Sequence, residues 1–163
     1  MVIERENMLN EEYLNDLDDQ LAQERLRARK LVVKYNQQML GSAEADATLK
    51  ELLGSVGEDA LVEVSFRYDY GCNIHLSDSV VMHCNFILLD VCEICVGTRT
   101  SFGPNVQIHT ASHPLNVEVR ARRLLCGKSI TIVEDIVVTK DVPPVCVYAG
   151  NPAKSIKKVG RVE

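Results

Sequence analysis

Four histidines and one cysteine pair are the side chains of this sequence with the most chemical potential. His75, His83, His109 and His113 are 8, 26 and 4 residues apart, and three imidazoles can together hold a zinc ion. These intervals are irregular, which argues against a shared metal site. Cys92-Glu93-Ile94-Cys95 has the spacing of a redox or metal pair, but no second pair accompanies it. We therefore predict no metal site, and we expect the six cysteines to pack as small apolar or surface side chains.

His113 lies in the turn Thr110-Ala111-Ser112-His113-Pro114-Leu115. A hydroxyl is a poor nucleophile at neutral pH, and a neutral imidazole within hydrogen-bond reach can remove its proton as it attacks a thioester. A histidine in a proline-containing loop can also serve only to hold the backbone. Taken alone, the residues of this turn leave both roles open.

Apolar residues with a six-residue period lead into this turn, over residues 74–109. The period is seen at Leu76, Met82 and Leu88 and, after a shift of two residues, at Val96, Phe102 and Ile108. An α-helix would space apolar residues by three and four, and a hairpin strand by two. The pattern predicts a hexapeptide solenoid, in which three short strands close one triangular coil of about 18 residues. The alternative is an ordinary β-sandwich with coincidental spacing.

The N-terminal third of the chain is predicted to be helical. Residues 11–40 contain no proline or glycine, acidic residues crowd the first turns, and Asn10 is the predicted N-cap. A hinge near Asp18-Asp19 divides this segment into two helices. Asp46 is predicted to cap a further short helix, which Gly54 ends. Because such helices cannot bury their apolar faces alone, we expect them to dock on the solenoid.

The chain is therefore predicted to be mainly β, with a helical cap over residues 1–55 and a β-helix over residues 56–163. From Val56 the composition changes to β-branched residues and cysteines. The segment 110–128 breaks the period and is predicted to protrude as a loop. A short basic tail follows Pro143-Pro144 at the C-terminus.

Composition narrows the classes of partner. The chain has 163 residues, of which 46% are hydrophobic, enough for a buried core. Its net charge of −5 provides no basic stripe, so we expect no nucleic-acid partner. No apolar run is long enough to span a bilayer, and the first ten residues are polar and charged. We therefore expect no membrane partner and a cytoplasmic location.

Several blocks of sequence, in order, cover the chain nearly from end to end. They include Leu52-Leu53-Gly54-Ser55-Val56-Gly57, Asp69-Tyr70-Gly71, Gly103-Pro104-Asn105-Val106-Gln107-Ile108, Ala111-Ser112-His113-Pro114-Leu115, Val138-Thr139-Lys140-Asp141-Val142-Pro143-Pro144 and Ala149-Gly150-Asn151-Pro152-Ala153-Lys154. Together they resemble the maltose and galactoside O-acetyltransferases, trimeric enzymes with a left-handed parallel β-helix. The left hand comes from this resemblance only, since a parallel crossover is ordinarily right-handed.

The resemblance implies transfer of an acetyl group from acetyl-CoA to a hydroxyl of a sugar such as maltose, glucose or a galactoside. It implies that His113 is the general base and that a homotrimer shares its sites between neighbouring subunits. The acceptor-binding residues it implies are Asp16, Arg25, Asp69, His83 and Asn85, where His83 replaces an asparagine of the family. Carboxylates and amides suit a sugar because they bind its hydroxyls in pairs.

For acetyl-CoA the resemblance implies Thr139 and Lys140, and Lys154 or Lys157 can meet the phosphates. The chain departs from the family after Ile132, where more than one further coil of the family pattern is absent from the sequence. In the family those coils line the pantetheine channel and offer a backbone N–H to the oxyanion, and losing one such donor can cost roughly 100- to 1,000-fold in rate. A second function is therefore an inactive relative that serves as a carbohydrate-binding or assembly module.

Overall fold

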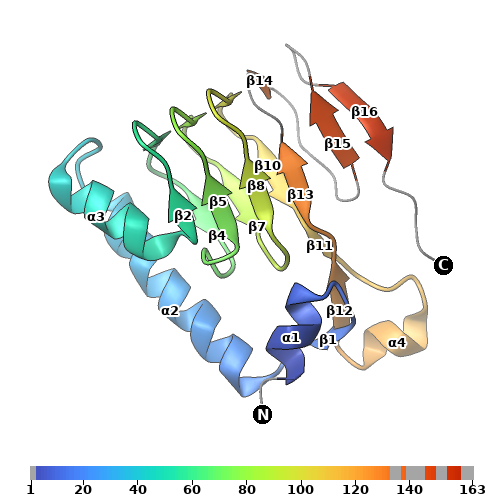
Figure 1. The fold of residues 1–163 in the computed structure, drawn as a ribbon. Helices are drawn as coiled ribbons and strands as arrows, with labels where there is room; N and C mark the ends of the chain where they lie inside the picture. Colours follow the sequence, from blue (N-terminus) through green and yellow to red (C-terminus); the bar gives the residue numbers. More distant parts are fainter. Residues whose placement is uncertain (1–2, 133–136, 139–145, 150–153, 159–163) are drawn as a thin grey trace.

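The protein is described from a computed structural model, which covers residues 3–132, 137–138, 146–149 and 154–158. These residues form a left-handed parallel β-helix with helices at its N-terminal end and a small antiparallel sheet beside it (Figure 1). The predicted mainly β class with a helical cap is thus confirmed, and the β-sandwich alternative is wrong. None of the described helices is both long and apolar enough to cross a membrane.

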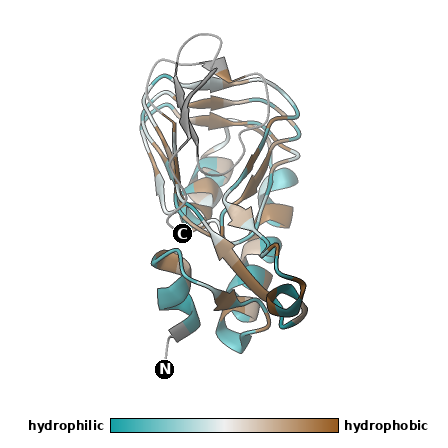
Figure 2. Ribbon diagram, turned by 90° about the vertical axis from the view of Figure 1, so that its right-hand side faces the viewer, coloured by the Kyte–Doolittle hydropathy of each residue, from teal (hydrophilic) through white to brown (hydrophobic). Residues whose placement is uncertain are grey.

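Three walls of parallel strands make up the solenoid, and Figure 2 shows them from the C-terminal side of the stack. The first wall contains β2 (Ser55–Val56), β5 (Ile74–Leu76), β8 (Ile94–Val96), β13 (Ile130–Ile132) and β15 (Cys146–Ala149), with β16 (Lys154–Lys158) antiparallel at its end. The second contains β3 (Leu61–Val62), β6 (Val81–Met82), β9 (Ser101–Phe102) and β14 (Val137–Val138). The third contains β4 (Arg67–Tyr68), β7 (Ile87–Leu89) and β10 (Gln107–His109).

One coil contains twenty residues. His75 pairs with Ser55 in the coil before it and with Cys95 in the coil after it. The expected coil of about 18 residues is therefore too short. Equivalent apolar positions lie six residues apart from the first wall to the second and from the second wall to the third. The corner from the third wall back to the first is two residues longer, which explains the shift seen in the apolar period.

Asp90 organises this longer third corner from a fully buried position. Its carboxylate accepts hydrogen bonds from the backbone N–H groups of Asp69, Tyr70 and Gly71 at 3.0, 2.9 and 2.7 Å. Burial raises the pKa of the Asp90 carboxyl to about 7, while these donors act to lower it. The Asn73 side chain donates to the Asp90 carbonyl at 2.7 Å. The corner is thus held by side chains as well as by the strand ladder.

Columns of apolar side chains from successive coils fill the interior. Phe66, Phe86 and Phe102 are completely buried, and the rings of Phe86 and Phe102 meet edge to face with centroids 5.1 Å apart. Residues that alternate with these face outward, so each wall has one apolar and one mixed face. The interior needs no ligand to be filled.

Helices α2 (Asp19–Asn36) and α3 (Ala43–Leu52) cover the open edge of the first coil (Figure 1). The Asn36 side chain accepts from the Phe66 N–H at 3.1 Å and donates to the Phe66 carbonyl at 2.9 Å. The Tyr35 hydroxyl donates to the Val62 carbonyl, and the Tyr68 hydroxyl donates to the Ala28 carbonyl at 3.0 Å. The Tyr35 and Asn36 side chains replace the partners that a preceding coil would supply.

The helix boundaries differ from those predicted. Asp18 is the N-cap of α2, and its carboxylate accepts from the backbone N–H groups of Gln20 and Leu21. Ser42, and not Asp46, caps α3.

Of the two helices predicted within residues 11–40, the first is wrong. α1 (Ile3–Leu9) ends before Asn10, and the strand β1 (Leu14–Asn15) follows. β1 pairs with β12 (Leu124–Gly127), which also pairs with β11 (Ala111–Ser112). We call β1, β12 and β11 the side sheet. Its pairing partner lies more than a hundred residues away, so local sequence carries no signal for β1. The segment 110–128 supplies two of its strands and also α4 (Val117–Ala121).

Replacing Asn36 by Ala should destabilise the fold by about 1–3 kcal/mol, because the Phe66 N–H and carbonyl both lose their partner at the edge of the first coil. Urea unfolding followed by far-UV circular dichroism measures the change. The matched control is Gln37→Ala at the exposed next residue, which should change stability by less than about 0.5 kcal/mol. Equal stability of Asn36→Ala and the control would contradict the capping role.

Replacing Asp90 by Asn should alter the pH dependence of stability. The pKa of Asp90 rises from 3.8 to about 7 on folding, so protonation favours the folded state. This contribution is complete below about pH 4 and is lost as the pH rises through about 7. Asp90→Asn loses an acceptor for one N–H, so we expect lower stability at pH 5 and a gap to the wild type that narrows by about 1–2 kcal/mol towards pH 8. A gap that stays constant across this range in urea titrations would refute the raised pKa.

Candidate functional site

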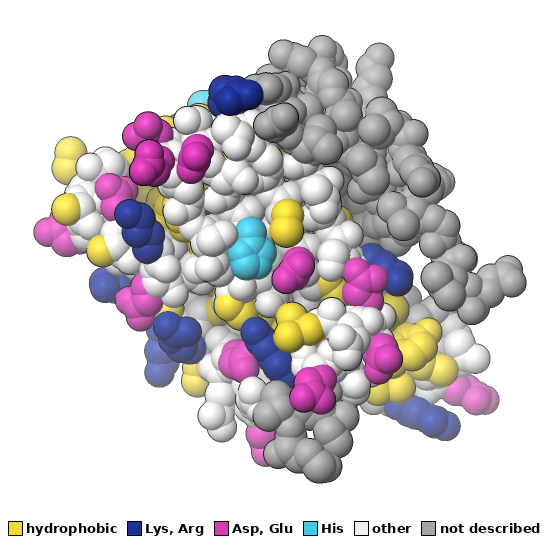
Figure 3. Space-filling view, in the orientation of Figure 1, with side chains coloured by type: hydrophobic (Ala, Val, Ile, Leu, Met, Phe, Trp, Pro, Cys, Tyr) yellow, Lys and Arg dark blue, Asp and Glu magenta, His cyan; other side chains and the backbone are white. Residues whose placement is uncertain are grey.

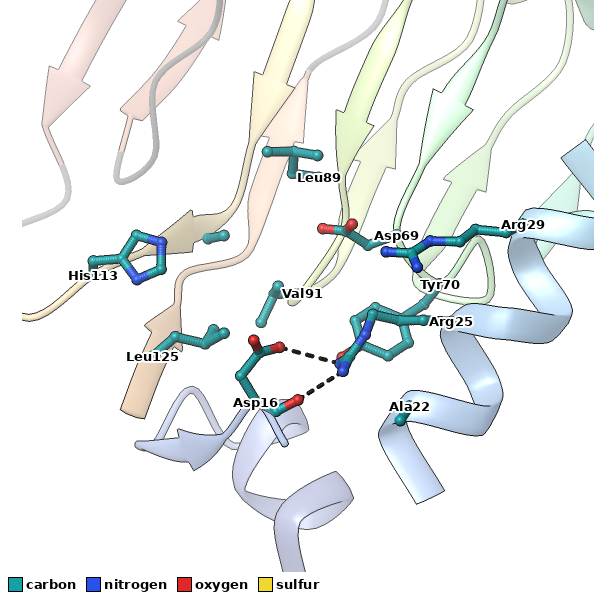
Figure 4. A pocket seen from close by; sticks show the side chains of 11 residues that line it. Asp16, Ala22, Arg25, Arg29, Asp69, Tyr70, Leu89, Val91, His113 and Leu125 are labelled. Carbon is teal, nitrogen blue, oxygen red and sulfur yellow. Dashed lines mark hydrogen bonds and ion pairs between the residues drawn. The ribbon is translucent and has the colours of Figure 1, made fainter. Parts of the chain in front are cut away.

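A cavity of about 430 Å³, here called the main cavity, lies between α2, the third corner and the side sheet. Figure 4 shows that Arg25, Arg29 and Asp69 lie on one side of it and His113 on the other. Its lining consists of Asp16, Ala22, Arg25, Arg29, Asp69, Tyr70, Leu89, Val91, Ala111, His113 and Leu125. The structure thus brings together His113 and three of the predicted acceptor residues, which come from four separate parts of the chain.

The side sheet positions two of these residues. Asp16 follows β1 directly and His113 follows β11 directly, and both strands pair with β12. The Asp16 N–H also donates to the Arg123 carbonyl at 3.3 Å. Two backbone ladders therefore fix the separation between the Asp16 carboxylate and the His113 imidazole.

A second apolar core, separate from the solenoid interior, supports the side sheet. It contains Met8, Leu14, Leu21, Tyr70, Val91, Cys92 and Leu125, with Ala111 packed against it. This core lies below the main cavity and shares Tyr70, Val91 and Leu125 with the cavity lining. The packing of α1 and β1 therefore determines the shape of the cavity floor.

An ion pair ties the N-terminal arm, by which we mean α1, β1 and the residues between them, to the end of the segment 110–128. The Glu11 carboxylate accepts from the Lys128 ammonium at 2.8 Å and from the Ser129 N–H at 2.9 Å. Burial acts to raise the pKa of Glu11, but these two bonds lower it on balance. Glu11 has a φ of 61°, in the left-handed region, and the two bonds hold it in this conformation.

Arg25 joins the polar residues of the main cavity. Its guanidinium donates to the Tyr70 hydroxyl and to the Asp16 carbonyl, both at 2.6 Å, and lies 3.3 Å from the Asp16 carboxylate. It also lies over the Tyr70 ring, 5.6 Å from the centroid. Burial raises the pKa of the neighbouring Asp69 carboxyl, while Arg25 and Arg29 act to lower it. Arg25 thereby orients one carboxylate and favours ionisation of the other.

His113 faces these groups from the exposed end of β11. Within the described part of the chain its imidazole has no hydrogen-bond partner, so both ring nitrogens are accessible. A hydroxyl bound between His113 and the carboxylates has a base on one side and hydrogen-bond acceptors on the other. This arrangement suits deprotonation of a polyhydroxylated molecule.

His83 and Asn85 lie outside the main cavity, at the corner between the second and third walls. The His83 Nδ1 is 3.1 Å from Glu63 Oε1, and the Asn85 side chain donates to Asn105 at 2.6 Å. Asn85 has a φ of 62°, as the turn at this corner requires. Both side chains are exposed, so a single chain does not join them to the other predicted acceptor residues.

The structure describes little of the residues predicted to bind acetyl-CoA. Thr139 and Lys140 lie outside the described residues. Lys154 and Lys157 lie in β16, of which only the backbone is described, and it pairs antiparallel to β15. Among the described residues, no group of three or more His, Cys, Asp or Glu is placed to hold a metal ion. His75, one of the four histidines considered for zinc, instead lies 3.1 Å from the Ser55 hydroxyl.

The sequence interpretation missed Arg29 and the roles of Tyr70 and Asp90. Arg29 lies four residues after Arg25, hence on the same helix face, which was a usable signal. Tyr70 is part of the block Asp69-Tyr70-Gly71, but its contact with Arg25 depends on the docking of α2. Asp90 ends an apolar strand, and its buried contacts follow only from the twenty-residue stacking.

Comparisons with known proteins agree with this architecture. Residues 7–57 match the maltose acetyltransferase hexapeptide capping motif. Nodulation protein L of Rhizobium meliloti is 32% identical to the chain, and the match covers 93% of this chain and 96% of that protein. Two solved structures are similar along nearly the whole chain. A maltose O-acetyltransferase from Clostridium difficile is 33% identical with a TM-score of 0.79, covering 97% of this chain and 98% of the other.

The second structure is a hexapeptide-repeat-containing acetyltransferase from Vibrio cholerae in complex with acetyl coenzyme A. It is 26% identical with a TM-score of 0.72, and the match covers 97% of this chain and 99% of the other. These similarities extend over the helical cap, the solenoid and the side sheet together. The chain belongs to the maltose and galactoside O-acetyltransferase family of hexapeptide-repeat acyltransferases.

Proposed function

We propose that the protein transfers an acetyl group from acetyl-CoA to a hydroxyl of a sugar such as maltose, glucose or a galactoside, with His113 as general base. The observation that carries this proposal is the main cavity, where His113 faces Asp16, Asp69 and Arg25. Family membership supports acetyl transfer as the type of reaction. The complex of the Vibrio cholerae relative supports acetyl-CoA as the donor.

In this mechanism the acceptor hydroxyl lies between the His113 imidazole and the thioester carbonyl carbon. His113 takes the hydroxyl proton as the oxygen attacks that carbon, and a tetrahedral intermediate forms. The intermediate then breaks its carbon–sulfur bond, and the imidazolium proton passes to the departing thiolate. The products are the sugar acetate and free CoA, and His113 returns to its neutral form.

The carboxylates orient the acceptor in this proposal. Asp16, held by Arg25, and Asp69, held at the third corner by the bond from its N–H to Asp90, can each accept from sugar hydroxyls. Pairs of such bonds restrict the rotation of a sugar ring and direct one hydroxyl to the base. Five described cysteines are free thiols, which suits the reducing cytoplasm where we place the reaction.

We further propose that a homotrimer completes the site with His83 and Asn85 from a neighbouring subunit. Both are exposed at a corner distant in the coil from the third corner. In a ring with three-fold symmetry, one corner of each copy faces a different corner of the next. A polar amide and an imidazole that lie outside the main cavity of their own chain are suitable contributions to such a shared site.

A second candidate is an inactive carbohydrate-binding or assembly module. The observation that favours it is the short connection between β13 and β15, since Ile132 pairs with Tyr148 at a smaller interval than the twenty residues that separate paired strands before the segment 110–128. The alignment with nodulation protein L also runs over 176 positions, more than the 163 residues of this chain. The short interval supports the proposed deletion after Ile132, where the resemblance implies the pantetheine channel, and the alignment length is consistent with a gap in this chain.

Replacing His113 by Ala should reduce sugar-dependent thiol release from acetyl-CoA by about 100- to 10,000-fold, because the acceptor loses its base. The matched control is His75→Ala, on the first wall and outside the main cavity, which should retain wild-type rates. Thiol release is measured with maltose, glucose and a galactoside. Wild-type protein that is folded but releases no thiol with any acceptor would favour the inactive module instead.

Mixing two inactive variants tests the shared site. His113→Ala and Asn85→Ala subunits, denatured, mixed equally and refolded, should regain roughly a quarter of wild-type activity if each site combines residues of two subunits. The reason is that some sites then receive His113 from one subunit and Asn85 from the other. Each variant refolded alone should remain inactive. No recovery in a mixture that sedimentation shows to be trimeric would exclude sharing of these two residues.

A further inference from the structure

A second cavity opens beside the main one. It has a volume of about 250 Å³ and shares Asp16, His113 and Leu125 with the main cavity, while Arg120, Arg123 and Leu124 complete its lining. We call it the loop-side cavity, because the stretch from α4 to β12 supplies four of its six lining residues. A molecule bound in the main cavity can therefore extend past His113 into this space.

The two cavities differ in charge. In the main cavity two carboxylates, Asp16 and Asp69, stand against two guanidinium groups, Arg25 and Arg29. The loop-side cavity adds two more guanidinium groups and no further carboxylate among its lining residues. Elsewhere the surface is mixed, and the face in Figure 3 shows acidic and basic side chains interspersed. A local excess of positive charge is notable in a chain whose net charge is −5.

The two arginines of the loop-side cavity differ in whether their guanidinium groups are free to bind a ligand. The Arg120 guanidinium donates to the carbonyls of Pro114 and Leu115 at 2.8 and 3.2 Å, so it holds the turn that follows His113. Arg123 is exposed, and its side chain has no ion pair or hydrogen bond within the described residues. Its backbone is fixed, since its carbonyl accepts from the Asp16 N–H. Arg123 is therefore a positioned cation with free donors.

A guanidinium with free donors recognises carboxylates and phosphates through paired hydrogen bonds. The phosphates of acetyl-CoA are poor candidates for Arg123. The full pantetheine arm separates them from the thioester, which must lie beside His113, whereas Arg123 lines the same small cavity as His113. The anion that Arg123 meets must lie close to the reacting hydroxyl, and so it belongs to the acceptor.

We propose that, among sugars, the preferred acceptor is an acidic one that carries a carboxylate or phosphate, and that Arg123 binds this group in the loop-side cavity while His113 deprotonates a hydroxyl of the same molecule. Only the deprotonation by His113 in this statement rests on the proposed acetyl transfer. Binding of the acidic group depends on the cavity and not on turnover. The main cavity then holds the sugar ring between its two carboxylates and its two guanidinium groups.

The test compares acidic and neutral sugars in binding to the full-length protein. Ligand-observed NMR measures Kd for glucuronate, glucose 6-phosphate, glucose and maltose, with inorganic phosphate as the bare anion. We expect both acidic sugars to bind about tenfold more tightly than glucose, which corresponds to one charge-assisted hydrogen-bonded contact. The preference should weaken at high salt, because exposed charges are screened.

Arg123→Gln should abolish this preference and leave binding of glucose unchanged. Arg123→Lys should retain part of it, because the charge remains without the paired donors. The matched control is Arg122→Gln, an exposed neighbour that lines neither cavity, and it should behave as the wild type. Glutamine at position 123 retains the backbone bond to Asp16 and adds no β-branched side chain at the φ of 62° found there.

Three results would overturn the inference. One is equal affinity for acidic and neutral sugars, and another is inorganic phosphate binding as tightly as glucose 6-phosphate. The third is an Arg123→Gln variant whose KM changes for acetyl-CoA and not for the acceptor. If acid-selective binding is found but no sugar is acetylated, the proposed transfer fails while the acceptor inference stands.

Discussion

Backbone hydrogen bonding between coils at an interval of twenty residues is the constraint on which the structure depends. Strands of successive coils pair along each wall, so a residue such as His75 has fixed neighbours on both sides. The repeat leaves the first coil with an open edge, and α2 and α3 cover it through the side chains of Tyr35 and Asn36. The helical cap is therefore a structural requirement of the solenoid and not an appended domain.

The same constraint places the functional site. The coil needs two extra residues at its third corner, and Asp90 uses its buried carboxylate to hold three successive N–H groups there. Asp69 and Tyr70 project from that corner towards α2, where Arg25 meets them. The longer corner thus provides both the irregularity in the repeat and one wall of the main cavity.

The opposite wall belongs to a second structural unit. The side sheet joins the N-terminal arm to the segment 110–128 and rests on its own apolar core. His113 and Arg123 both come from this unit, one for the proposed proton transfer and one for the proposed acceptor charge. Changes in the arm or in this segment can therefore alter acceptor choice without any change in the solenoid.

The amino-acid sequence by itself determined the solenoid, because a six-residue apolar period is a local pattern that each coil repeats, and His113 was recognisable from its surrounding block. The gathering of Asp16, Arg25 and Asp69 around it followed from family resemblance and not from any local pattern. The two-residue shift in the apolar period already reflected the longer corner, whereas only the tertiary structure decided the strand at β1 and the position of Arg123 beside the base. Each of these depends on pairing between distant segments, and a hydrogen bond across a hundred residues leaves no periodicity in the chain.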